Sequence, residues 1–392
     1  MKICLSMIVK NEAHVILRSL NSVLPIIDSW VITDTGSTDG TQQIIEDFFK
    51  EKNIPGKLIQ SDWTDFSTAR NSSLEETEKL ADYGFWIDAD EELILRETFT
   101  KEKFLKELEG FESMSLSTVY DQANYTRKNI WKTGTGHKWT GPIHELLSKE
   151  DETESTISSC VYVLVKAEGS SWNNIAEKYS NHAKVLEAYT EVDNNPRWVY
   201  YTAQSYRDAG NLEKALEWYK KRANTEEGYL EEIYAAKLMI AIISDKLSLG
   251  DDIIINAFLA AQTFDPIRAE AIANLIVYLQ SKQLWEHAYI YSKYGATYQG
   301  KNPFPNRNTF VDHNLYEYKL VELHYLSCFY SNRLPEGSWF YWKQREIFND
   351  LKVSKEVKDS IIQNQQYYPL AEAKKYGFIN TDKIVGLKPK RK

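Results

Sequence analysis

The first ninety residues alternate between short apolar runs and segments of helical periodicity, and this alternation limits the possible folds more than any other feature. The apolar runs have the length and composition of strands, and they cover residues 2–9, 30–33, 57–60 and 84–87. The segments between them repeat apolar residues at helical spacing, over residues 13–24, 41–52 and 67–80. Repeated β-α units of this size predict a parallel sheet with right-handed crossovers.

Polar clusters follow three of these predicted strands. They are Lys-Asn-Glu at 10–12, Asp-Thr-Gly at 34–36 and Asp-Ala-Asp-Glu at 88–91. Ligands of open α/β sheets bind beyond the carboxyl ends of the strands. We therefore expect the three clusters to converge in space, although they are far apart in the sequence.

The remainder of the chain changes in character twice. Residues 113–165 are β-rich, with predicted strands at 115–120, 130–132 and 159–165, whereas strand patterns nearly vanish after residue 171. In the second half, Ala203, Tyr206, Gly210, Ala215 and Tyr219 follow the small and large alternation of a tetratricopeptide helix pair. Pro196 and Pro266 lie 70 residues apart, which is twice the repeat period of about 34.

We therefore predict three helical repeats, of which the middle one (228–264) is degenerate. Capping helices are expected at 315–330, 339–349 and 355–367, and the basic tail 388–392 is expected to be disordered. At 392 residues the chain exceeds what one hydrophobic core usually serves. The predicted domains are an α/β domain at 1–170 and an all-α repeat domain at 171–392.

Charge is divided unevenly between the two predicted domains. Residues 1–170 hold 18 Lys and Arg against 29 Asp and Glu, a net charge of −11, and the remainder holds 29 against 27, a net charge of +2. The acidic first domain does not suit a polyanion but suits a divalent cation. Because the second domain is nearly neutral and has no basic face before its tail, we expect no nucleic-acid partner.

The sequence also constrains where the protein works. No apolar run reaches the roughly 18 residues needed to span a membrane, and the N-terminus reads as a strand rather than a signal peptide. Three scattered cysteines (Cys4, Cys160 and Cys328) are too few for a disulfide framework or a zinc cluster. These features favour a reducing, cytoplasmic location.

Asp88 and Asp90 form the clearest chemical motif, because they directly follow an apolar strand. Two carboxylates at a strand end can hold Mg²⁺ or Mn²⁺, whose remaining positions take phosphate oxygens. Taken alone, the pair reads equally well as an acidic turn.

The pair is one of five motifs that occur in a fixed order: SMIVKNE (6–12), DTGSTDGT (34–41), FSTARN (66–71), WIDADE (86–91) and WTGPIHE (139–145). This ordered set resembles the family 2 glycosyltransferases with the GT-A fold, and the resemblance covers about residues 1–170. The helical remainder resembles the tetratricopeptide extension of some bacterial, phage and viral members. The layout is similar to that of sublancin-type peptide S-glycosyltransferases.

The resemblance implies a nucleotide-sugar site. Asp34 matches the carboxylate that accepts a hydrogen bond from uracil, and its alternative role is that of a turn residue capping the next helix. Asn11 and Glu12 match residues lining the nucleotide pocket, or else simply cap a helix. Arg70 matches a basic residue near the nucleotide, where it pairs with phosphate or base; alternatively, it only neutralises this acidic edge.

The resemblance also implies catalytic residues. Glu145 stands where the family carries a carboxylate that removes the acceptor's proton while the acceptor attacks opposite the diphosphate. His144 beside it is an alternative active group or a structural histidine. Gly141 and Pro142 suggest a fixed loop, and Trp139 is expected to stack on sugar or acceptor.

For the metal, the resemblance implies Asp88 and Asp90 as ligands, with Asp90 the direct one. Many members add a histidine before a glycine further along, and here Glu168 precedes Gly169 instead. Glu168 is therefore expected either to replace that histidine as an oxygen ligand of Mg²⁺ or Mn²⁺, or to leave the position to water.

These expectations combine into an inverting, metal-dependent hexosyltransferase that uses a UDP-sugar such as UDP-glucose or UDP-GlcNAc. Its acceptor is expected to be a protein, peptide or glycan. The helical half is expected either to hold this acceptor or to form a homodimer contact. The alternative is a peptide-binding repeat scaffold with a degenerate glycosyltransferase domain. Retention of all five key residues favours the enzyme, and they are Asp34, Arg70, Asp88, Asp90 and Glu145.

Overall fold

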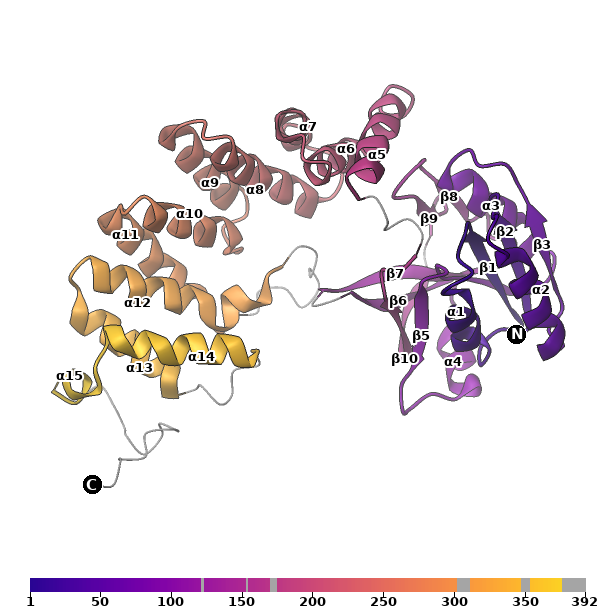
Figure 1. Ribbon diagram of the computed structural model, residues 1–392, viewed down its shortest axis with the longest axis horizontal. Coiled ribbons are helices and arrows are strands. Elements are labelled where there is room, and N and C mark those ends of the chain that lie inside the picture. Colours follow the sequence, from indigo (N-terminus) through magenta and orange to yellow (C-terminus); the bar gives the residue numbers. More distant parts are fainter. Residues whose placement is uncertain (121–122, 153, 170–174, 302–310, 347–352, 376–392) are drawn as a thin grey trace. The chain divides into compact units, whose positions relative to one another are not determined.

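The computed structural model describes residues 1–120, 123–152, 154–169, 175–301, 311–346 and 353–375 (Figure 1). The chain divides into two compact units, Met1–Asn211 and Leu212–Lys392. The first unit extends past the boundary proposed near residue 170, because it includes helices α5 (Ile175–Tyr189) and α6 (Pro196–Asp208). These two helices pack against each other within that unit.

An eight-stranded sheet in the order β3-β2-β1-β4-β7-β6-β10-β5 forms the centre of the first unit. Its strands are β1 (Ile3–Val9), β2 (Ser29–Asp34), β3 (Gly56–Gln60), β4 (Tyr83–Trp86), β5 (Glu91–Leu95), β6 (Ser113–Tyr120), β7 (Ala123–Lys132) and β10 (Ser155–Val165). The first four are parallel neighbours, as the β-α alternation predicts. β6 and β10 are also parallel, whereas β7 and β5 pair antiparallel with their neighbours.

Four helices flank this sheet: α1 (Ile16–Val23), α2 (Thr41–Lys52), α3 (Phe66–Thr77) and α4 (Lys101–Leu108). The first three lie where the sequence predicts helices, and α2 has the predicted bounds. The helix predicted from residue 13 starts later, because residues 13–15 form a turn in which the Glu12 carbonyl accepts hydrogen bonds from Val15 and Ile16. α4, β5 and the first half of β7 were not predicted.

Strand alternation separates two of the apolar cores of the first unit. Phe85 and Ile87 belong to a large apolar core that also contains side chains of α1, α2 and α4. Trp86, between them in the sequence, belongs to a smaller core with Leu74 of α3 and Trp139. Neighbouring residues of a strand point to opposite faces of a sheet. The aromatic side chains around the predicted site therefore belong to the core that contains α3.

A second, two-stranded sheet consists of β8 (Lys138–Thr140) and β9 (Leu146–Ser148), which pair antiparallel. The loop between these strands, residues 141–145, contains the predicted catalytic residues His144 and Glu145. We call it the hairpin loop.

The described part of the second unit is helical. Its longer helices are α7 (Leu212–Ala223), α8 (Leu230–Lys246), α9 (Asp251–Phe264), α10 (Glu270–Ser281), α11 (Trp285–Gly295), α12 (Leu320–Tyr330), α13 (Leu334–Glu346), α14 (Lys355–Gln363) and α15 (Leu370–Lys375). α8 packs against α9 and α10 against α11, as expected of helical repeats. The predicted fold class, an α/β domain with a mainly parallel sheet followed by helical repeats, is confirmed. Residues 347–349 of one predicted capping helix and the tail 388–392 lie outside the described residues.

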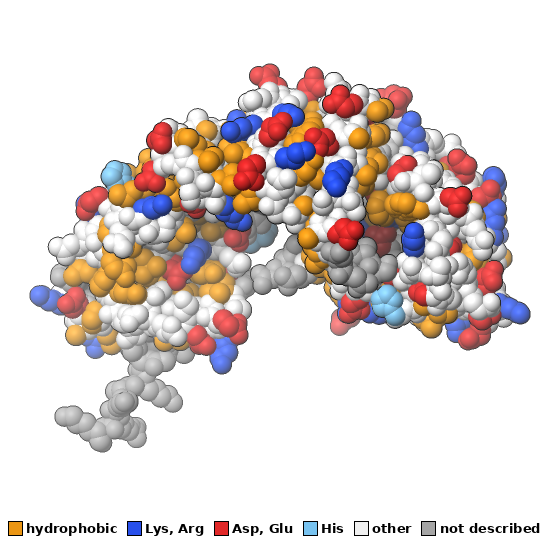
Figure 2. Space-filling view, turned by 45° about the horizontal axis from the view of Figure 1, so that its top comes forward, with side chains coloured by type: hydrophobic (Ala, Val, Ile, Leu, Met, Phe, Trp, Pro, Cys, Tyr) orange, Lys and Arg blue, Asp and Glu red, His pale blue; other side chains and the backbone are white. Residues whose placement is uncertain are grey.

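Charged side chains of both signs are interspersed over the described helices of the second unit on the face shown in Figure 2. This mixture agrees with the small net charge of that half of the sequence. Within the described ranges, no helix combines the length and the hydropathy needed to cross a lipid bilayer.

Candidate functional site

The polar clusters after β1 and β2 contact each other, as the sheet topology predicts. Val9 is the register partner of Asp34, so the two strands end side by side. The Asn11 amide donates to Ser37 Oγ at 2.8 Å, and Asn11 Oδ1 accepts from the Thr38 amide at 2.8 Å. Asn11 has a φ of 58°, a left-handed conformation that asparagine tolerates better than most residues. Asn11 therefore holds the loop after β2 in place.

Asp34 lies at the end of β2 and is 1% exposed. Its Oδ1 accepts hydrogen bonds from the Gly36 and Ser37 amides and from Gln42 Nε2, at 2.9–3.0 Å. Its Oδ2 is buried and has no hydrogen-bond partner within the described residues. An unpaired buried acceptor is costly, and this one can be satisfied by a ligand N–H. Oδ1 of Asp34 thus forms the contacts of the turn role, whereas the ligand role of Asp34 stays a prediction.

Arg70, on α3, links two predicted functional carboxylates. Its Nε donates to Glu145 Oε1 at 2.6 Å, and an Nη donates to Asp88 Oδ1 at 2.7 Å. Burial alone would lower the Arg70 pKa, but the charges of Asp88 and Glu145 outweigh it and raise the pKa. Burial would likewise raise the pKa of Asp88, but Arg70 above all holds it below its usual range. Arg70 and Asp88 are therefore both ionised near pH 7.

Two indole rings enclose the guanidinium of Arg70. Its central carbon lies 4.7 Å from the Trp86 ring centre and 4.9 Å from that of Trp139. Trp139 is 4% exposed, and its backbone exchanges two hydrogen bonds of 2.9 Å with the Asn71 side chain. The contacts of Trp139 in this structure are thus to Arg70 and the core, whereas stacking on sugar or acceptor remains a prediction.

A second, largely buried ion pair packs against Trp86. Arg127 of β7 donates to both carboxylate oxygens of Glu91 at 2.8 and 2.9 Å, and its guanidinium packs on Trp86. Glu91 also accepts from the Asp88 amide at 3.2 Å. Sequence reasoning missed this pair, because β7 and its register with β6 were not predicted where Arg127 lies.

Residues before and after the hairpin loop in the sequence hold it in place. The Pro142 carbonyl accepts from the Phe66 amide at the start of α3. Ile143 packs against Leu186 of α5 and Trp198 of α6. Gly141 has a φ of 91°, and a Cβ at this position would lie 2.2 Å from the Trp198 ring, so only glycine fits here. The loop that contains Glu145 is therefore shaped by α6.

His144 and Glu145 have different surroundings although they are neighbours. Glu145 has its side chain 11% exposed, and no hydrogen bond to its Oε2 is found within the described ranges. The His144 ring stacks on Tyr201 of α6 at 4.2 Å and meets His182 of α5 edge-on. Burial, followed by the charge of neighbouring groups, lowers the His144 pKa to about 3. His144 is thus neutral near pH 7 and poorly suited to accept a proton there.

Asp90 and Glu168 lie near each other in the fold but bind different groups. Asp90 Oδ2 accepts from the Gly169 amide at 3.2 Å, and a Cβ on Gly169 would lie 2.9 Å from that oxygen. The Glu168 carboxylate pairs with Arg18 at 2.5 Å and has a lowered pKa, chiefly through this hydrogen bond. Among the described residues, no three acidic, imidazole or thiol groups at this edge are close enough to ligate one ion. Asp88 and Asp90 still supply the hard oxygen donors that fit Mg²⁺ or Mn²⁺.

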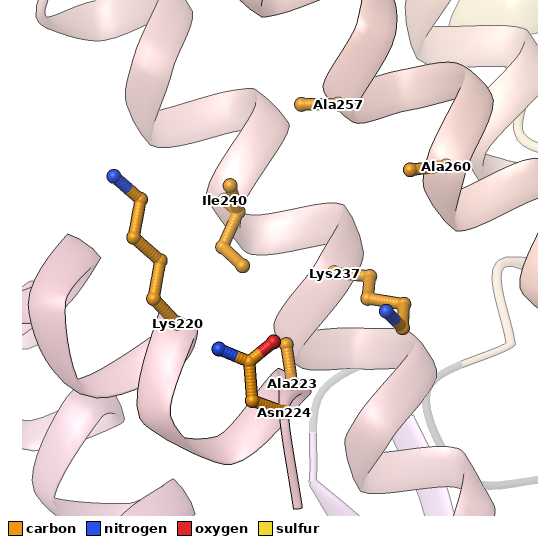
Figure 3. Close-up of a pocket in the computed structure, with 7 residues that line it drawn as sticks. All are labelled: Lys220, Ala223, Asn224, Lys237, Ile240, Ala257 and Ala260. Atoms are coloured by element: carbon orange, nitrogen blue, oxygen red, sulfur yellow. The ribbon is translucent and has the colours of Figure 1, made fainter.

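A separate pocket of about 190 Å³ lies in the second unit and contains none of the predicted site residues (Figure 3). Its lining residues come from α7 and its end, α8 and α9, and they are Lys220, Ala223, Asn224, Lys237, Ile240, Ala257 and Ala260. Two lysines and one amide on small apolar walls suit a polar or anionic group of a ligand.

Comparison with known proteins places the first part of the chain in a family. Residues 4–168 match the family model described as "Glycosyl transferase family 2". This part of the chain belongs to glycosyltransferase family 2, and the helical part follows it as an extension.

Particular relatives share parts of this layout. A "TPR repeat-containing protein" of Synechococcus elongatus is 33% identical over 153 residues, which are 37% of this chain and 35% of the relative. The "SPbeta prophage-derived glycosyltransferase SunS" of Bacillus subtilis is 24% identical over 235 residues, which are 57% of this chain and 54% of the relative. The chain thus matches only about a third to a half of the length of these relatives.

Among solved structures, the chain is similar to TarS of S. aureus, with 13% identity and a TM-score of 0.38 over 68% of this chain and 55% of TarS. It is also similar to the mannosyltransferase PcManGT of Pyrobaculum calidifontis, solved with GDP-Man and Mn²⁺. That match has 12% identity and a TM-score of 0.35 over 67% of this chain and 84% of that one.

Proposed function

We propose that this protein transfers a sugar from a UDP-sugar to a protein, peptide or glycan acceptor with inversion at the anomeric carbon. The observation that carries the proposal is the Arg70 bridge, because it joins Glu145 of the hairpin loop to Asp88 at the end of β4. A base and a carboxylate of the diphosphate site are thereby held in one rigid cluster. Positioning of this kind supplies a large part of the rate enhancement in group transfer.

In this proposal Glu145 is the general base. Its Oε1 is held by Arg70, so the side chain has a fixed orientation while Oε2 faces the acceptor. Oε2 accepts the proton of the acceptor as the acceptor attacks the anomeric carbon. The role of Arg70 is to orient Glu145 and to place positive charge beside the departing diphosphate.

The donor is assigned as a uridine nucleotide because of Asp34. Oδ2 of Asp34 is the buried acceptor without a protein partner in the described ranges. The N3–H of uracil is a donor, whereas the corresponding ring nitrogen of cytosine carries no hydrogen. Asn11, whose contacts hold the loop after β2, would keep Asp34 in place, and Glu12 would line the same pocket.

Asp88 and Asp90 would hold Mn²⁺ or Mg²⁺, and the bound ion would neutralise the charge that develops on the diphosphate. Asp88 also contacts Arg70, so it would connect the cation to the guanidinium. Glu168 is kept as a third ligand only if its carboxylate leaves Arg18.

The helical unit is proposed to hold the acceptor, and the pocket of Figure 3 is one place where a polar acceptor group fits. A homodimer contact is the other role proposed for this unit. The three cysteines are buried and unpaired, which supports a reducing compartment such as the cytoplasm.

The test is a screen of UDP-sugar hydrolysis by the full chain, with Mn²⁺ and with excess EDTA. Glu145→Gln keeps the shape and the Arg70 contact but removes the base. It should lower transfer by about 10²–10⁴-fold, whereas Glu75→Gln on the exposed side of α3 should not. Absence of hydrolysis with every UDP-sugar in the screen, or full activity in EDTA, would count against the proposal.

A further inference from the structure

The backbone of the hairpin loop has an uncommon conformation directly before Glu145. His144 has a φ of 54°, in the left-handed region that costs conformational energy for a residue other than glycine. The ring of His144 stacks on Tyr201 of α6, whereas the carboxylate of Glu145 accepts a hydrogen bond from Arg70 of α3. An ordinary φ at His144 would send the chain after it in another direction and move Glu145 away from Arg70.

Arg197, in the first turn of α6, holds the peptide group that follows this φ. One Nη of Arg197 donates a hydrogen bond to the His144 carbonyl at 3.1 Å. A hydrogen bond from a charged donor is stronger than one between neutral groups. The carbonyl belongs to the planar peptide unit that joins His144 to Glu145. The hydrogen bond therefore fixes the plane from which the Glu145 side chain extends.

Arg197 is itself held by its own helix. Asn195, the N-cap of α6, accepts from the Arg197 amide through Oδ1 at 3.0 Å. The guanidinium carbon of Arg197 lies 4.6 Å from the ring centre of Tyr201, which follows four residues later and so lies on the same face of the helix. The Tyr201 ring also stacks on the His144 imidazole at 4.2 Å. One turn of α6 thus contacts both the side chain and the carbonyl of His144.

We propose that Arg197 is a positioning residue that sets the orientation of Glu145. This inference rests on the proposed function, in which Glu145 is the general base. Arg70 holds the carboxylate of Glu145, and Arg197 holds the backbone directly before it. The two arginines come from α3 and α6, so they fix Glu145 from two different helices.

The two arginines differ in what else they contact. Arg70 also pairs with Asp88, so its removal disturbs the proposed diphosphate site together with the base. The hydrogen bond and the ring contact of Arg197 are instead with His144 and Tyr201. Loss of Arg197 should therefore lower kcat and leave the affinity for UDP nearly unchanged, because a displaced base weakens the transition state rather than donor binding.

The test is Arg197→Ala in the full chain, with Mn²⁺ and a UDP-sugar that the parent protein hydrolyses. A displacement of about 1 Å can cost about 10²-fold in rate, so we expect kcat to fall at least about tenfold. The Kd for UDP, measured by calorimetry, should stay that of the parent protein. Arg197→Lys keeps a charged donor and should lose less activity than Arg197→Ala.

A double substitution separates positioning from a general loss of stability. Glu145→Gln has no base to position, so Arg197→Ala should lower hydrolysis no further in that background. A structural role alone would lower hydrolysis in both backgrounds. The matched control is Arg207→Ala, on the last turn of the same helix, which removes an ion pair of 2.7 Å with Asp208 and should leave kcat unchanged.

Hydrogen exchange measures the hairpin loop without any need for activity. Residues 138–148 should exchange faster in Arg197→Ala than in the parent protein or in Arg207→Ala. The inference is overturned if this exchange is unchanged, if Arg197→Ala keeps the parent kcat, or if it lowers hydrolysis equally in Glu145→Gln. A parent protein that hydrolyses no UDP-sugar would refute the sugar-transfer proposal instead, and the exchange would still show whether Arg197 holds the loop.

Discussion

Replacement of Arg70 by alanine tests the central bridge of the site. The side chain of Arg70 is 7% exposed and forms ion pairs of 2.6 and 2.7 Å with Glu145 and Asp88. In Arg70→Ala, both carboxylates lose the cation that they hydrogen-bond, and the two indole rings lose the group that packs on them. Removal of one partner from a buried ion pair costs about 3–5 kcal/mol. Because the Asp88 side chain is 35% exposed, solvent screens its share, and we expect a loss of about 3 kcal/mol in the free energy of unfolding.

The expected loss depends on pH, and its sign follows from Asp88. In the parent protein the folded pKa of Asp88 is lowered, chiefly because Arg70 outweighs the effect of burial. Its ionisation therefore stabilises the fold above the unfolded pKa, and this contribution disappears as the pH falls through the folded pKa. Without Arg70, burial is opposed only by the charges of Arg127 and Lys178, so the pKa of Asp88 should rise. The difference between parent and variant should thus be largest near pH 7 and shrink below about pH 4.

Urea denaturation followed by tryptophan fluorescence measures this difference, since Trp86 and Trp139 contact the guanidinium directly. The control is Lys57→Ala, which removes an exposed ion pair with Glu76 of α3 and should cost about 0–1 kcal/mol. If Arg70→Ala and Lys57→Ala unfold at the same urea concentration near pH 7, the bridge does not stabilise this edge.

Three further substitutions test single residues of the site. Asp34→Asn keeps the acceptor for the loop but replaces Oδ2 with a donor, so calorimetry should show a smaller preference for UDP over CDP; an unchanged ratio contradicts the uracil assignment. His144→Asn, which tolerates the φ of 54°, should lower transfer by far less than the about 10²–10⁴-fold expected for a general base. If the role of Glu168 is to pair with Arg18, Glu168→Gln should leave unchanged the Mn²⁺ concentration that gives half-maximal transfer. A higher Mn²⁺ concentration for half-maximal transfer would instead support Glu168 as a metal ligand.

The sequence predicts the parallel half of the sheet well because its signals are local. Each strand there is a short apolar run, and each helix repeats its apolar residues at helical spacing, so elements such as β1 and α2 can be read without their neighbours. β7 was predicted only at 130–132, because Ala123–Asn129 is largely polar and becomes a strand through its pairing with β6. Such pairing is set by tertiary context.

The same distinction holds for the site. Asp34 and Asp88 follow strands of one parallel sheet, so the topology alone places them at the same edge of that sheet. The partners of Arg70 and Glu168 are not readable in this way, because Glu145 and Arg18 lie 75 and 150 residues away in the sequence. The contacts of Arg70 with Asp88 and Glu145 correspond to one of the roles considered for it, neutralisation of the acidic edge. No local pattern indicated that Trp198 would pack on the hairpin loop.

Trp198 therefore leads to a prediction about which part of the chain the sugar-transfer site needs. α6 is helical and lies beyond residue 170, yet its Trp198 is 2% exposed, packs with Ile143 and occupies the space beside Gly141. Trp198→Ala would leave a cavity against the hairpin loop, and such truncations cost about 3–5 kcal/mol when the surroundings do not collapse. If the loop moves to fill the cavity, Glu145 moves with it.

We expect Trp198→Ala to lower both slow donor hydrolysis and transfer, because a displacement of the base affects every acceptor, water included. The matched variant is Lys220→Ala, in the pocket of the second unit, where the side chain contacts no predicted site residue (Figure 3). It should leave hydrolysis unchanged and raise the apparent KM for a macromolecular acceptor if that pocket holds it. Unchanged hydrolysis in Trp198→Ala would mean that the sugar-transfer site needs no residue beyond about residue 170. Equal loss in both variants would mean that catalysis depends on the whole helical part, since Trp198 and Lys220 belong to different units.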